Sequence, residues 1–334
     1  MTRPVVAVTI GDPSGIGPEI VQKAVQKKAL NRRARLLIIG DSFLFDPSLL
    51  PRSSRTSFLA LRISRRNFHR QRFPQLLDWG HTPFAIPTGR ISKRCGQMSY
   101  DYLETAVSLA LRGYVDGIVT APINKRAWAV AGIRFPGHTE MLAAHTHTRH
   151  FAMAFYAKGF YTVLLSTHLP LQRAISSLHP GLLCEKARLV TRELSALGIR
   201  KPRIAVAGIN PHAGEAGLLG KEEIKIMAPA IRQCRRERIA LHGPYPADTL
   251  YLRAAAGEFD AVLAPYHDQA MIAVKALSFG HATNITLGLP FVRTSVDHGT
   301  AFDIAGKGIA NEGALAEAID RCVVLIEARQ KAKR

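Results

Sequence analysis

Short apolar runs alternate with amphipathic segments along this chain. The runs that predict buried strands occupy residues 5–10, 36–39, 117–120, 151–156, 161–166, 204–207 and 261–264. Apolar positions recur at helical spacing in other segments, which predicts helices over residues 102–114, 180–197, 222–238 and 312–328. Strands that alternate with helices in this way indicate an α/β protein built around a largely parallel sheet.

The length of the chain indicates more than one domain. Its 334 residues exceed the size at which a single hydrophobic core stops growing, about 250 to 300 residues. We therefore expect two domains. Residues 47–94 have the least regular pattern and are rich in arginine, serine and proline, so they predict exposed loops and an irregular strand.

The charge of the chain raises the question of nucleic acid or membrane binding. The formal net charge is +20, but much of the excess lies in residues 23–35, 52–72 and 329–334, away from the segments with chemical motifs. No basic stripe interleaved with aromatic residues accompanies these runs, which predicts solvated faces and no nucleic-acid partner. No apolar stretch approaches the roughly 18 to 20 residues that span a bilayer, so we expect no membrane association.

The cellular compartment follows from the N-terminus and the cysteines. The opening apolar run at residues 5–10 is too short for the core of a signal peptide. The cysteines lie far apart and lack the C-x-x-C spacing of a zinc ribbon or redox motif; they are Cys95, Cys184, Cys234 and Cys322. We expect reduced thiols in a cytoplasmic protein.

Three of the apolar runs end on a histidine, namely TVLLSTH at His168, IAVAGINPH at His212 and AVLAPYH at His267. Neutral imidazole is the commonest protein ligand for divalent metals, and ligands of open α/β sheets bind beyond the carboxyl ends of strands. The shared placement therefore predicts a three-histidine metal site. Asp268 could orient the imidazole of His267 or bind the metal through water.

Two loops resemble known phosphate-binding motifs only in part. Residues 11–19, GDPSGIGPE, form a turn before a helix but lack the G-x-G-x-x-G of a Rossmann fold. Residues 217–222, GLLGKE, lack the first glycine and the hydroxyl of a P-loop. The first loop is compatible either with an anion or cofactor site or with a well-capped turn.

Several other residues are candidates for anion binding or proton transfer. His138 and Thr139 open a helix, whose free N–H groups suit a phosphate or carboxylate; the H-x-E at His138 lacks the P-C-x-x-C of a zinc deaminase. Arg293 offers a two-pronged donor, Lys275 a point charge and Asn284 neutral hydrogen bonds, a combination that predicts a cradle for a phosphorylated acid. Asp248 suits equally a helix cap, a side chain that orients a metal ligand, or a base.

The motifs GDPSGIGPEI, TAPINK, GHTEMLA, STHLPL, GINPHAGEAG, GPYPADT, YHDQ and NITLGLPFVRTSVDHGTAFDIAGKG together resemble the 4-hydroxythreonine-4-phosphate dehydrogenase family. They match in order and over nearly the whole chain. GIGPEI and HGTAFDIAGKGIAN also resemble segments of isocitrate and isopropylmalate dehydrogenases. The chain departs from the family at Ala270, where glycine commonly follows YHDQ, and in the arginine-rich residues 52–72.

The resemblance implies a non-Rossmann, two-domain α/β/α fold of the isocitrate/isopropylmalate dehydrogenase type with a largely parallel sheet. It implies a cofactor-side domain of residues 1–125 plus 275–334 and a metal, substrate and dimer domain of residues 126–274. The active site would lie in a cleft at the interface of a homodimer. His267 would come from the partner chain relative to His168 and His212.

The resemblance also assigns residues to roles. The metal ligands it implies are His168, His212 and His267, the substrate-binding residues are His138, Thr139, Lys275, Asn284 and Arg293, and the cofactor segment is His298, Gly299, Thr300 and Ala301 with Asn311. The cofactors would be NAD or NADP and a divalent metal, with zinc or cobalt favoured by histidine ligands and magnesium possible if water fills the shell. The proton acceptor stays open between Lys125, Asp248 and a metal-bound hydroxide.

The implied reaction is NAD(P)-dependent oxidation of 4-phosphooxy-L-threonine and decarboxylation to 3-amino-2-oxopropyl phosphate, in pyridoxal 5'-phosphate biosynthesis. A related dehydrogenase that acts on a 4-phosphorylated threonate or erythronate, or on a cis-diol carboxylate, is the alternative within the family. Two other classes are a metal-dependent hydrolase, which would release product without NAD, and a nucleic-acid-binding protein, which would show steep salt dependence.

Overall fold

The computed structural model describes residues 3–46, 55–57, 74–278 and 282–332. The chain divides into two compact units. Unit 1 comprises Met1–Thr148 with Leu289–Glu327, and unit 2 comprises Arg149–Gly288 with Ala328–Arg334. These units divide after residues 148 and 288, whereas the family resemblance implies divisions after residues 125 and 274.

Unit 1 extends beyond residue 125 because the next helix packs on a long helix of the same unit. α4 (Lys93–Leu111) is capped by Ser92, whose side chain accepts a hydrogen bond from the backbone N–H of Cys95. On α5 (Lys125–Val130), the buried indole of Trp128 donates a hydrogen bond of 2.8 Å to the Ser99 hydroxyl of α4. These contacts tie residues after 125 to unit 1.

Unit 2 extends beyond residue 274 because a strand there pairs within its own sheet. β11 (Thr283–Leu287) pairs antiparallel with β6 (Ala152–Ala157), with Asn284 opposite Phe155. The sequence pattern does not predict β11, since its threonines and asparagine interrupt the apolar run.

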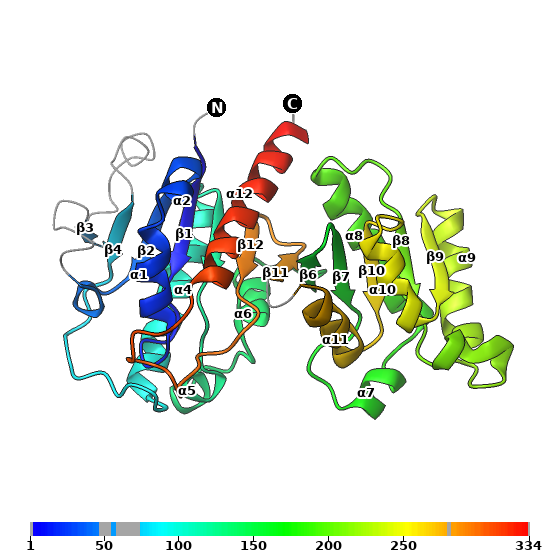
Figure 1. Cartoon of the computed structure of the whole chain (residues 1–334), viewed down its shortest axis with the longest axis horizontal. Coiled ribbons are helices and arrows are strands. Elements are labelled where there is room, and N and C mark those ends of the chain that lie inside the picture. Colours follow the sequence, from blue (N-terminus) through cyan, green and yellow to red (C-terminus); the bar gives the residue numbers. More distant parts are fainter. Residues whose placement is uncertain (1–2, 47–54, 58–73, 279–281, 333–334) are drawn as a thin grey trace. The chain divides into compact units, whose positions relative to one another are not determined.

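The strands of unit 1 are all parallel, in the order β3-β4-β2-β1-β5-β12. Their bounds are β1 Val5–Thr9, β2 Arg35–Gly40, β3 Arg55–Ser57, β4 Gln75–Asp78, β5 Gly117–Thr120 and β12 Val292–Ser295. Helices lie on both faces of this sheet (Figure 1). Besides α4 and α5, unit 1 contains α1 Gly17–Val25, α2 Lys28–Arg33, the short helix η1 Ser42–Leu44, α6 His138–His145 and most of α12 Gly313–Ala332.

The strands of unit 2 follow the order β11-β6-β7-β10-β8-β9, and β6 alone runs against its two neighbours. The remaining strands are β7 Phe160–Leu164, β8 Ile204–Ala207, β9 Leu241–Tyr245 and β10 Ala261–Ala264. The helical segments are α7 Leu171–Ser176, α8 Pro180–Ala196, η4 Pro211–Gly217, η5 Glu223–Met227, α9 Ala228–Arg236, α10 Ala247–Ala255 and α11 His267–Ser278.

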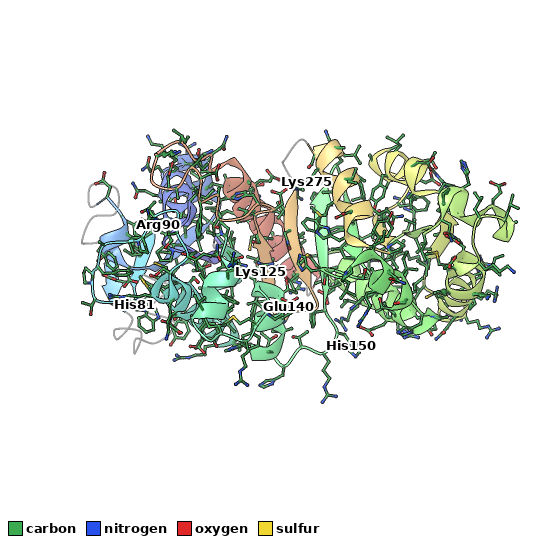
Figure 2. The ribbon with its side chains drawn as sticks, turned by 90° about the horizontal axis from the view of Figure 1, so that it is seen from below. His81, Arg90, Lys125, Glu140, His150 and Lys275 are labelled. Carbon is green, nitrogen blue, oxygen red and sulfur yellow. The ribbon has the colours of Figure 1, made fainter. Side chains whose placement is uncertain are left out.

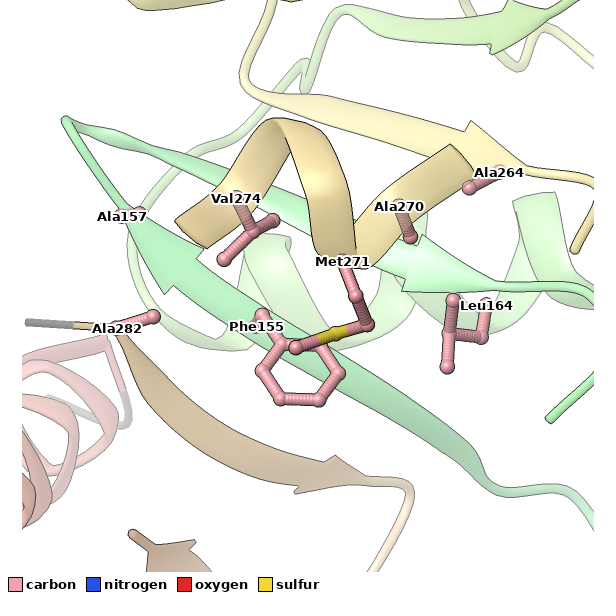
Figure 3. Close-up of a cluster of buried hydrophobic side chains, with 8 residues drawn as sticks. All are labelled: Phe155, Ala157, Leu164, Ala264, Ala270, Met271, Val274 and Ala282. Atoms are coloured by element: carbon pink, nitrogen blue, oxygen red, sulfur yellow. The ribbon is translucent and has the colours of Figure 1, made fainter. Parts of the chain in front are cut away.

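α11 is fixed by its apolar side. Ala270, Met271 and Val274 pack against Phe155 of β6 and Leu164 of β7 in a buried cluster (Figure 3). Ala270 has no exposed surface, so the residue that departs from the family's glycine is a packed core residue. This packing leaves the ends of α11 to carry polar side chains.

The predicted α/β class with a largely parallel sheet is confirmed. All of the strands predicted from apolar runs are present, and the four predicted helices correspond to α4, α8, η5 with α9, and α12. Of residues 47–94, β3, β4 and the segment up to α4 are described; the basic residues 52–72 lie outside the described part apart from 55–57. No helix among the described residues is long and apolar enough to cross a membrane.

Candidate active site

A buried arginine stands at the centre of the polar residues of unit 1. Arg293 lies on β12, whose neighbour is β5, and only 2% of it is exposed. One of its terminal nitrogens donates a hydrogen bond of 2.7 Å to the Thr120 hydroxyl. Burial lowers the pKa of Arg293 to about 9, while the negative charge of Glu140 opposes the shift. The guanidinium is thus a buried cation at neutral pH, and burial disfavours its charge.

His138 and Lys125 lie beside this cation. Burial, together with the charges of Arg293 and Lys125, holds the pKa of His138 well below its usual range. The imidazole is therefore neutral at pH 7, and its enclosed Nε2 atom has no hydrogen-bond partner. The ring stands edge-on to Trp128, with centroids 5.9 Å apart.

Gly137 marks where the charged side chains converge. A Cβ atom on Gly137 would lie 3.3 Å from Lys125 Cε and 3.5 Å from Glu140 Oε2 (Figure 2). Lys125 is the first residue of α5, where Asn124 caps the helix by accepting a hydrogen bond of 2.9 Å from the Ala127 N–H. The residues of this cluster come from β12, α5 and the start of α6.

The cluster can bind an anion. It brings together Arg293, Lys125 and His138, all named from the sequence, and the buried Thr139 follows His138 in the first turn of α6. Two cations and a helix N-terminus face one carboxylate, Glu140, which the sequence left without a role. The signal for Glu140 was the H-x-E spacing, which we interpreted only in terms of deaminases.

Two of the three predicted metal ligands meet in unit 2. His168 follows β7 and His267 opens α11, and their ring centroids lie 5.6 Å apart in the same chain. Two imidazoles on one tetrahedral zinc have centroids roughly 5 Å apart, so this pair fits a shared metal. His267 Nδ1 lies 2.7 Å from Asp268 Oδ1, which leaves Nε2 to face a metal.

His212 lies in the left-handed turn of η4, with φ of 52°, and its side chain is exposed. Among the described residues, no three histidine, cysteine or carboxylate side chains are grouped so that they could hold a metal. His168 and His267 meet within one chain, whereas the resemblance implies that His267 comes from the partner chain. Which chain supplies each metal ligand stays a prediction.

Three other predicted site residues lie in unit 2, and they are exposed or half-buried. Lys275 is exposed on α11, and Asn284 is half-buried on β11. Asp248 is exposed in the first turn of α10, where its Oδ1 accepts a hydrogen bond of 2.9 Å from the Thr249 N–H. That bond suits a helix-terminal role, and a role as base remains a prediction.

The predicted cofactor segment begins as a loop packed on unit 1. The Ile16 N–H donates to the Thr300 carbonyl at 3.0 Å, and a Cβ on Gly15 would lie 2.8 Å from Thr300 Cβ. His298 Nδ1 lies 2.9 Å from the Gly299 carbonyl, and the following Ala301 has a positive φ of 43°. A Cβ on Gly299 would meet nothing within 4 Å, so a ligand can approach this backbone.

The end of this segment is also held by a hydrogen bond. Asn311 Oδ1 accepts a hydrogen bond of 2.7 Å from the Gly313 N–H at the start of α12. A Cβ on Gly308 would also meet nothing within 4 Å. The residues present therefore suit a bound dinucleotide, since they offer accessible glycine backbone on a fixed loop.

Asp12, which the sequence did not single out, is fully buried in the loop after β1. Its Oδ1 accepts a hydrogen bond of 2.9 Å from the Ser14 N–H, and its Oδ2 has no hydrogen-bond partner. Burial raises the pKa of Asp12 to about 6, against the opposing effect of the Ser14 and Asn124 N–H groups. Burial in the folded chain thus favours the protonated form of the Asp12 carboxyl.

Asp12→Asn should stabilise the protein at alkaline pH. The folded-state pKa of Asp12 is above its unfolded value of 3.8, so its favourable contribution is present below that value and is lost as pH rises through about 6. At about pH 8 the buried carboxylate costs on the order of 1 to 3 kcal/mol, which a neutral amide avoids while it still accepts from Ser14. Thermal melts should show a gain for the variant at about pH 8 and little gain at about pH 4, near the unfolded-state pKa; equal gains at both would contradict the assignment.

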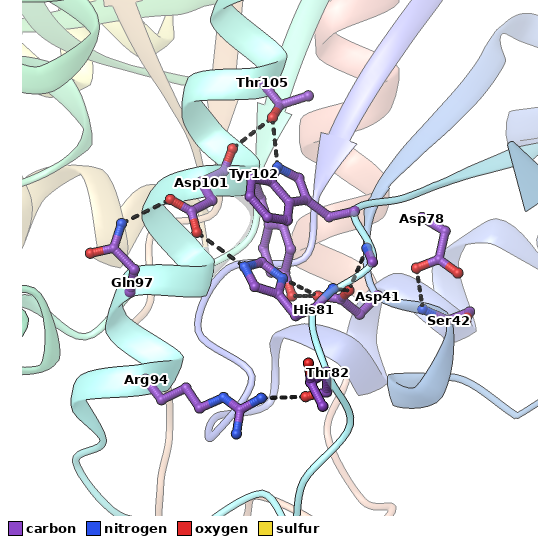
Figure 4. A network of polar contacts seen from close by, with 12 residues as sticks. Asp41, Ser42, Asp78, His81, Thr82, Arg94, Gln97, Asp101, Tyr102 and Thr105 are labelled. Carbon is purple, nitrogen blue, oxygen red and sulfur yellow. Dashed lines mark hydrogen bonds and ion pairs between the residues drawn. The ribbon is translucent and has the colours of Figure 1, made fainter. Parts of the chain in front are cut away.

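A second titratable cluster in unit 1 is structural (Figure 4). His81 places Nδ1 2.7 Å from Asp41 Oδ2 and Nε2 3.1 Å from Asp101 Oδ2. Asp41 is fully buried and also accepts from the Gly80 and His81 N–H groups and from the Tyr102 hydroxyl. These bonds anchor the segment after β4 to α4.

Comparison with known proteins agrees with the sequence motifs. Residues 32–322 match the family model described as pyridoxal phosphate biosynthetic protein PdxA. A 4-hydroxythreonine-4-phosphate dehydrogenase of Beijerinckia indica is 44% identical over 94% of this chain and 93% of its own length. A D-threonate 4-phosphate dehydrogenase of Salmonella typhimurium is 42% identical over 96% of this chain and 98% of its own length.

A solved structure gives the same result. The crystal structure of a 4-hydroxythreonine-4-phosphate dehydrogenase from Klebsiella pneumoniae aligns with a TM-score of 0.84 and 36% identity, over 97% of this chain and 98% of that chain. The family resemblance of the sequence motifs is thereby confirmed. Because the family model and these relatives extend over most of its length, the chain belongs to the family of the pyridoxal phosphate biosynthetic protein PdxA.

Proposed function

We propose that the protein is an NAD- or NADP-dependent and divalent-metal-dependent dehydrogenase of pyridoxal 5'-phosphate biosynthesis. It oxidises 4-phosphooxy-L-threonine at its secondary alcohol to a 2-amino-3-oxo acid, which loses carbon dioxide to give 3-amino-2-oxopropyl phosphate. The main support is the buried Arg293 with Lys125 and His138 beside it. A doubly charged phosphate offsets the cost of burying such cations.

The residues of unit 1 bind and orient the phosphorylated acid. Arg293 offers a forked donor that grips a phosphate or carboxylate, and Thr139 adds the N–H groups and hydroxyl of a helix N-terminus. His138 is neutral, so it can hydrogen-bond a substrate oxygen without adding charge. Lys275 and Asn284 of unit 2 remain proposed substrate ligands from the family motifs.

His168 and His267 would hold the metal with His212 of the partner subunit as the third ligand. If these histidines held a divalent metal, with zinc or cobalt favoured over magnesium, the metal would supply Lewis-acid chemistry at the substrate's oxygen. Asp268 fixes the imidazole of His267 so that one nitrogen is available.

A homodimer with shared sites accounts for the surroundings of these histidines. Exposed apolar side chains lie close to each of them in the sequence, and such side chains on unit 2 favour burial against another subunit. They are Leu169 and Leu171 near His168, Leu218 and Leu219 after His212, and Ile272 after His267.

The nicotinamide cofactor supplies the hydride acceptor, and residues 298–301 with Asn311 would bind it. Lys125 and Asp248 are the side chains that could take the proton of the alcohol. Lys125 has the better support because it lies in the anion-binding cluster beside His138, although both side chains are exposed. Cys95, Cys184, Cys234 and Cys322 are buried and form no disulfide in the described part of the chain, which supports a reducing, cytoplasmic setting.

Oxidation of D-threonate 4-phosphate is the second candidate. The Salmonella typhimurium relative with that name is nearly as similar to this chain as the Beijerinckia indica dehydrogenase. Both acids carry a phosphate and a secondary alcohol, and they differ in having an ammonium or a hydroxyl group beside the carboxylate. The anion-binding cluster of unit 1 suits either.

The deciding experiment assays the purified protein with 4-phosphooxy-L-threonine and D-threonate 4-phosphate in parallel. Each is offered with NAD or NADP and with zinc, cobalt or magnesium, and reduced cofactor and carbon dioxide are both measured. We expect turnover of 4-phosphooxy-L-threonine with carbon dioxide equal to reduced cofactor. Turnover of D-threonate 4-phosphate alone would replace the first candidate by the second, and product release without cofactor would overturn both.

A further inference from the structure

The ammonium group of Lys23 on α1 is fully engaged by three acceptors. It donates to Glu19 Oε1 at 2.7 Å, to the Gly308 carbonyl at 2.9 Å and to the Ala310 carbonyl at 2.8 Å. An ammonium has three donors, so none is left for a ligand. Lys23 is therefore a connector between α1 and the backbone of residues 308–310.

Glu19 completes the connection from one turn earlier on α1. The same Oε1 atom that accepts from Lys23 also accepts from the Ala310 N–H at 2.8 Å. The Glu19 side chain is 17% exposed and the Lys23 side chain 34% exposed, so water competes only in part for these bonds. The N–H and carbonyl of Ala310 are thus both bonded to side chains of α1.

These bonds fix a segment that has no regular secondary structure. Its early part is held by the Ile16 N–H on the Thr300 carbonyl, and its later part by the Lys307 N–H on the Ile304 carbonyl and by Glu19 and Lys23, before Asn311 caps α12. Gly306 and Gly308 have positive φ values of 75° and 72°, which make this backbone costly to order when it is unsupported. Without the two side chains, residues 306–310 would sample more conformations.

We propose that Lys23 and Glu19 are positioning residues for the nicotinamide cofactor, because they hold residues 308–311 in the conformation that the dinucleotide meets. The inference rests on the proposed function, in which residues 298–301 and Asn311 bind that cofactor. Neither side chain touches the cofactor. They order the loop before the cofactor binds, so the free energy of binding is not reduced by the cost of ordering it.

Lys23→Met tests the inference, because it keeps the apolar stem and removes all three bonds. Fluorescence titration of NADH and NADPH on the purified, uncleaved protein should show about 10- to 100-fold weaker binding than in the wild type. Amide hydrogen exchange without cofactor should become faster in residues 306–311 and stay unchanged in the core strands. At saturating cofactor the turnover number should stay within about threefold, so that the effect appears in KM. Lys23→Arg, which keeps a cation, should recover part of the affinity.

Lys27→Met is the matched control. It removes the same charge from the neighbouring turn, but Lys27 bonds a side chain, Glu312, at 2.8 Å and no backbone of the loop. We expect cofactor binding within about twofold of the wild type. Equal weakening by Lys27→Met, or unchanged binding and exchange in Lys23→Met, would overturn the inference. Failure of the wild type to bind either cofactor would instead contradict the proposed function.

Discussion

Arg293→Met should lower kcat/KM by about 100- to 1000-fold while the protein stays folded. The guanidinium is 2% exposed and is bonded to Thr120, so a substrate phosphate or carboxylate that reaches it is desolvated and held by a fork. Methionine fills a similar volume and offers no donor. Most of the loss should appear as a higher KM for the phosphorylated acid, with cofactor binding unchanged.

The melting temperature of Arg293→Met should stay equal or rise, although its activity falls. Burial lowers the pKa of Arg293 to about 9, so burial disfavours its charge. Replacing a buried cation by an apolar side chain is often neutral or stabilising. We expect the melting temperature without substrate to be equal or higher, and added inorganic phosphate to stabilise the wild type but not the variant.

Arg293→Lys supplies the comparison, since it keeps the charge and loses the fork. We expect its kcat/KM to lie between those of the wild type and Arg293→Met. Unchanged kcat/KM in Arg293→Met, in a protein with normal melting, would refute the anion-binding role.

Pairs of inactive histidine variants should restore each other's activity only in certain combinations. His168 and His267 meet within one chain. In the proposed metal site both come from one subunit, and His212 comes from the partner subunit. Each single alanine variant should lose bound metal and activity. In mixed dimers of His168→Ala with His212→Ala, one of the two sites contains all three histidines.

Random mixing of those two variants should restore about a quarter of the wild-type activity, because half of the dimers have one intact site. The same recovery is expected for His267→Ala with His212→Ala. Mixing His168→Ala with His267→Ala should restore none, since every site then lacks one ligand. Bound zinc, measured after dialysis, should follow the same proportions.

Other arrangements of the three histidines predict different results. If His267 came from the partner chain, His168→Ala with His267→Ala would complement. If all three came from one chain, every mixed pair would stay as inactive as the unmixed variants, because neither chain would contain all three histidines. Light scattering on each variant confirms that the dimers form.

Apolar runs predicted strands well where burial on both faces makes the run continuous, as in β1 and β10. They did not predict β12, because Arg293, Thr294 and Ser295 follow Val292 in it and are polar although they are buried. β12 places these polar side chains in the site. It therefore lacks the continuous apolar run from which strands are predicted. α4 begins at Lys93 and not at residue 102, since the small residues that pack against α5 do not show helical periodicity.

Among the site residues, the sequence named Arg293, His138 and Lys125 through their types and motifs, and the fold brings them together. It did not reveal Asp12 or Glu140, because a carboxylate in a loop or a first helical turn is ordinarily solvated or a cap. Burial distinguishes Asp12, and the charge of the neighbouring Arg293 distinguishes Glu140. The pKa of Asp12 depends on atoms from loops that are distant in sequence.

The sequence by itself determined the α/β class, the family and the chemical types available at each strand end, because these depend on local pattern and on ordered motifs. The tertiary structure decided which of these residues meet: His168 with His267, Arg293 with His138 and Lys125, and Lys23 with the backbone of residues 308–310. These encounters join residues up to 287 positions apart, and spacing along the chain does not encode them. They follow from strand order, since parallel pairing brings the ends of β5 and β12 to one edge of the sheet.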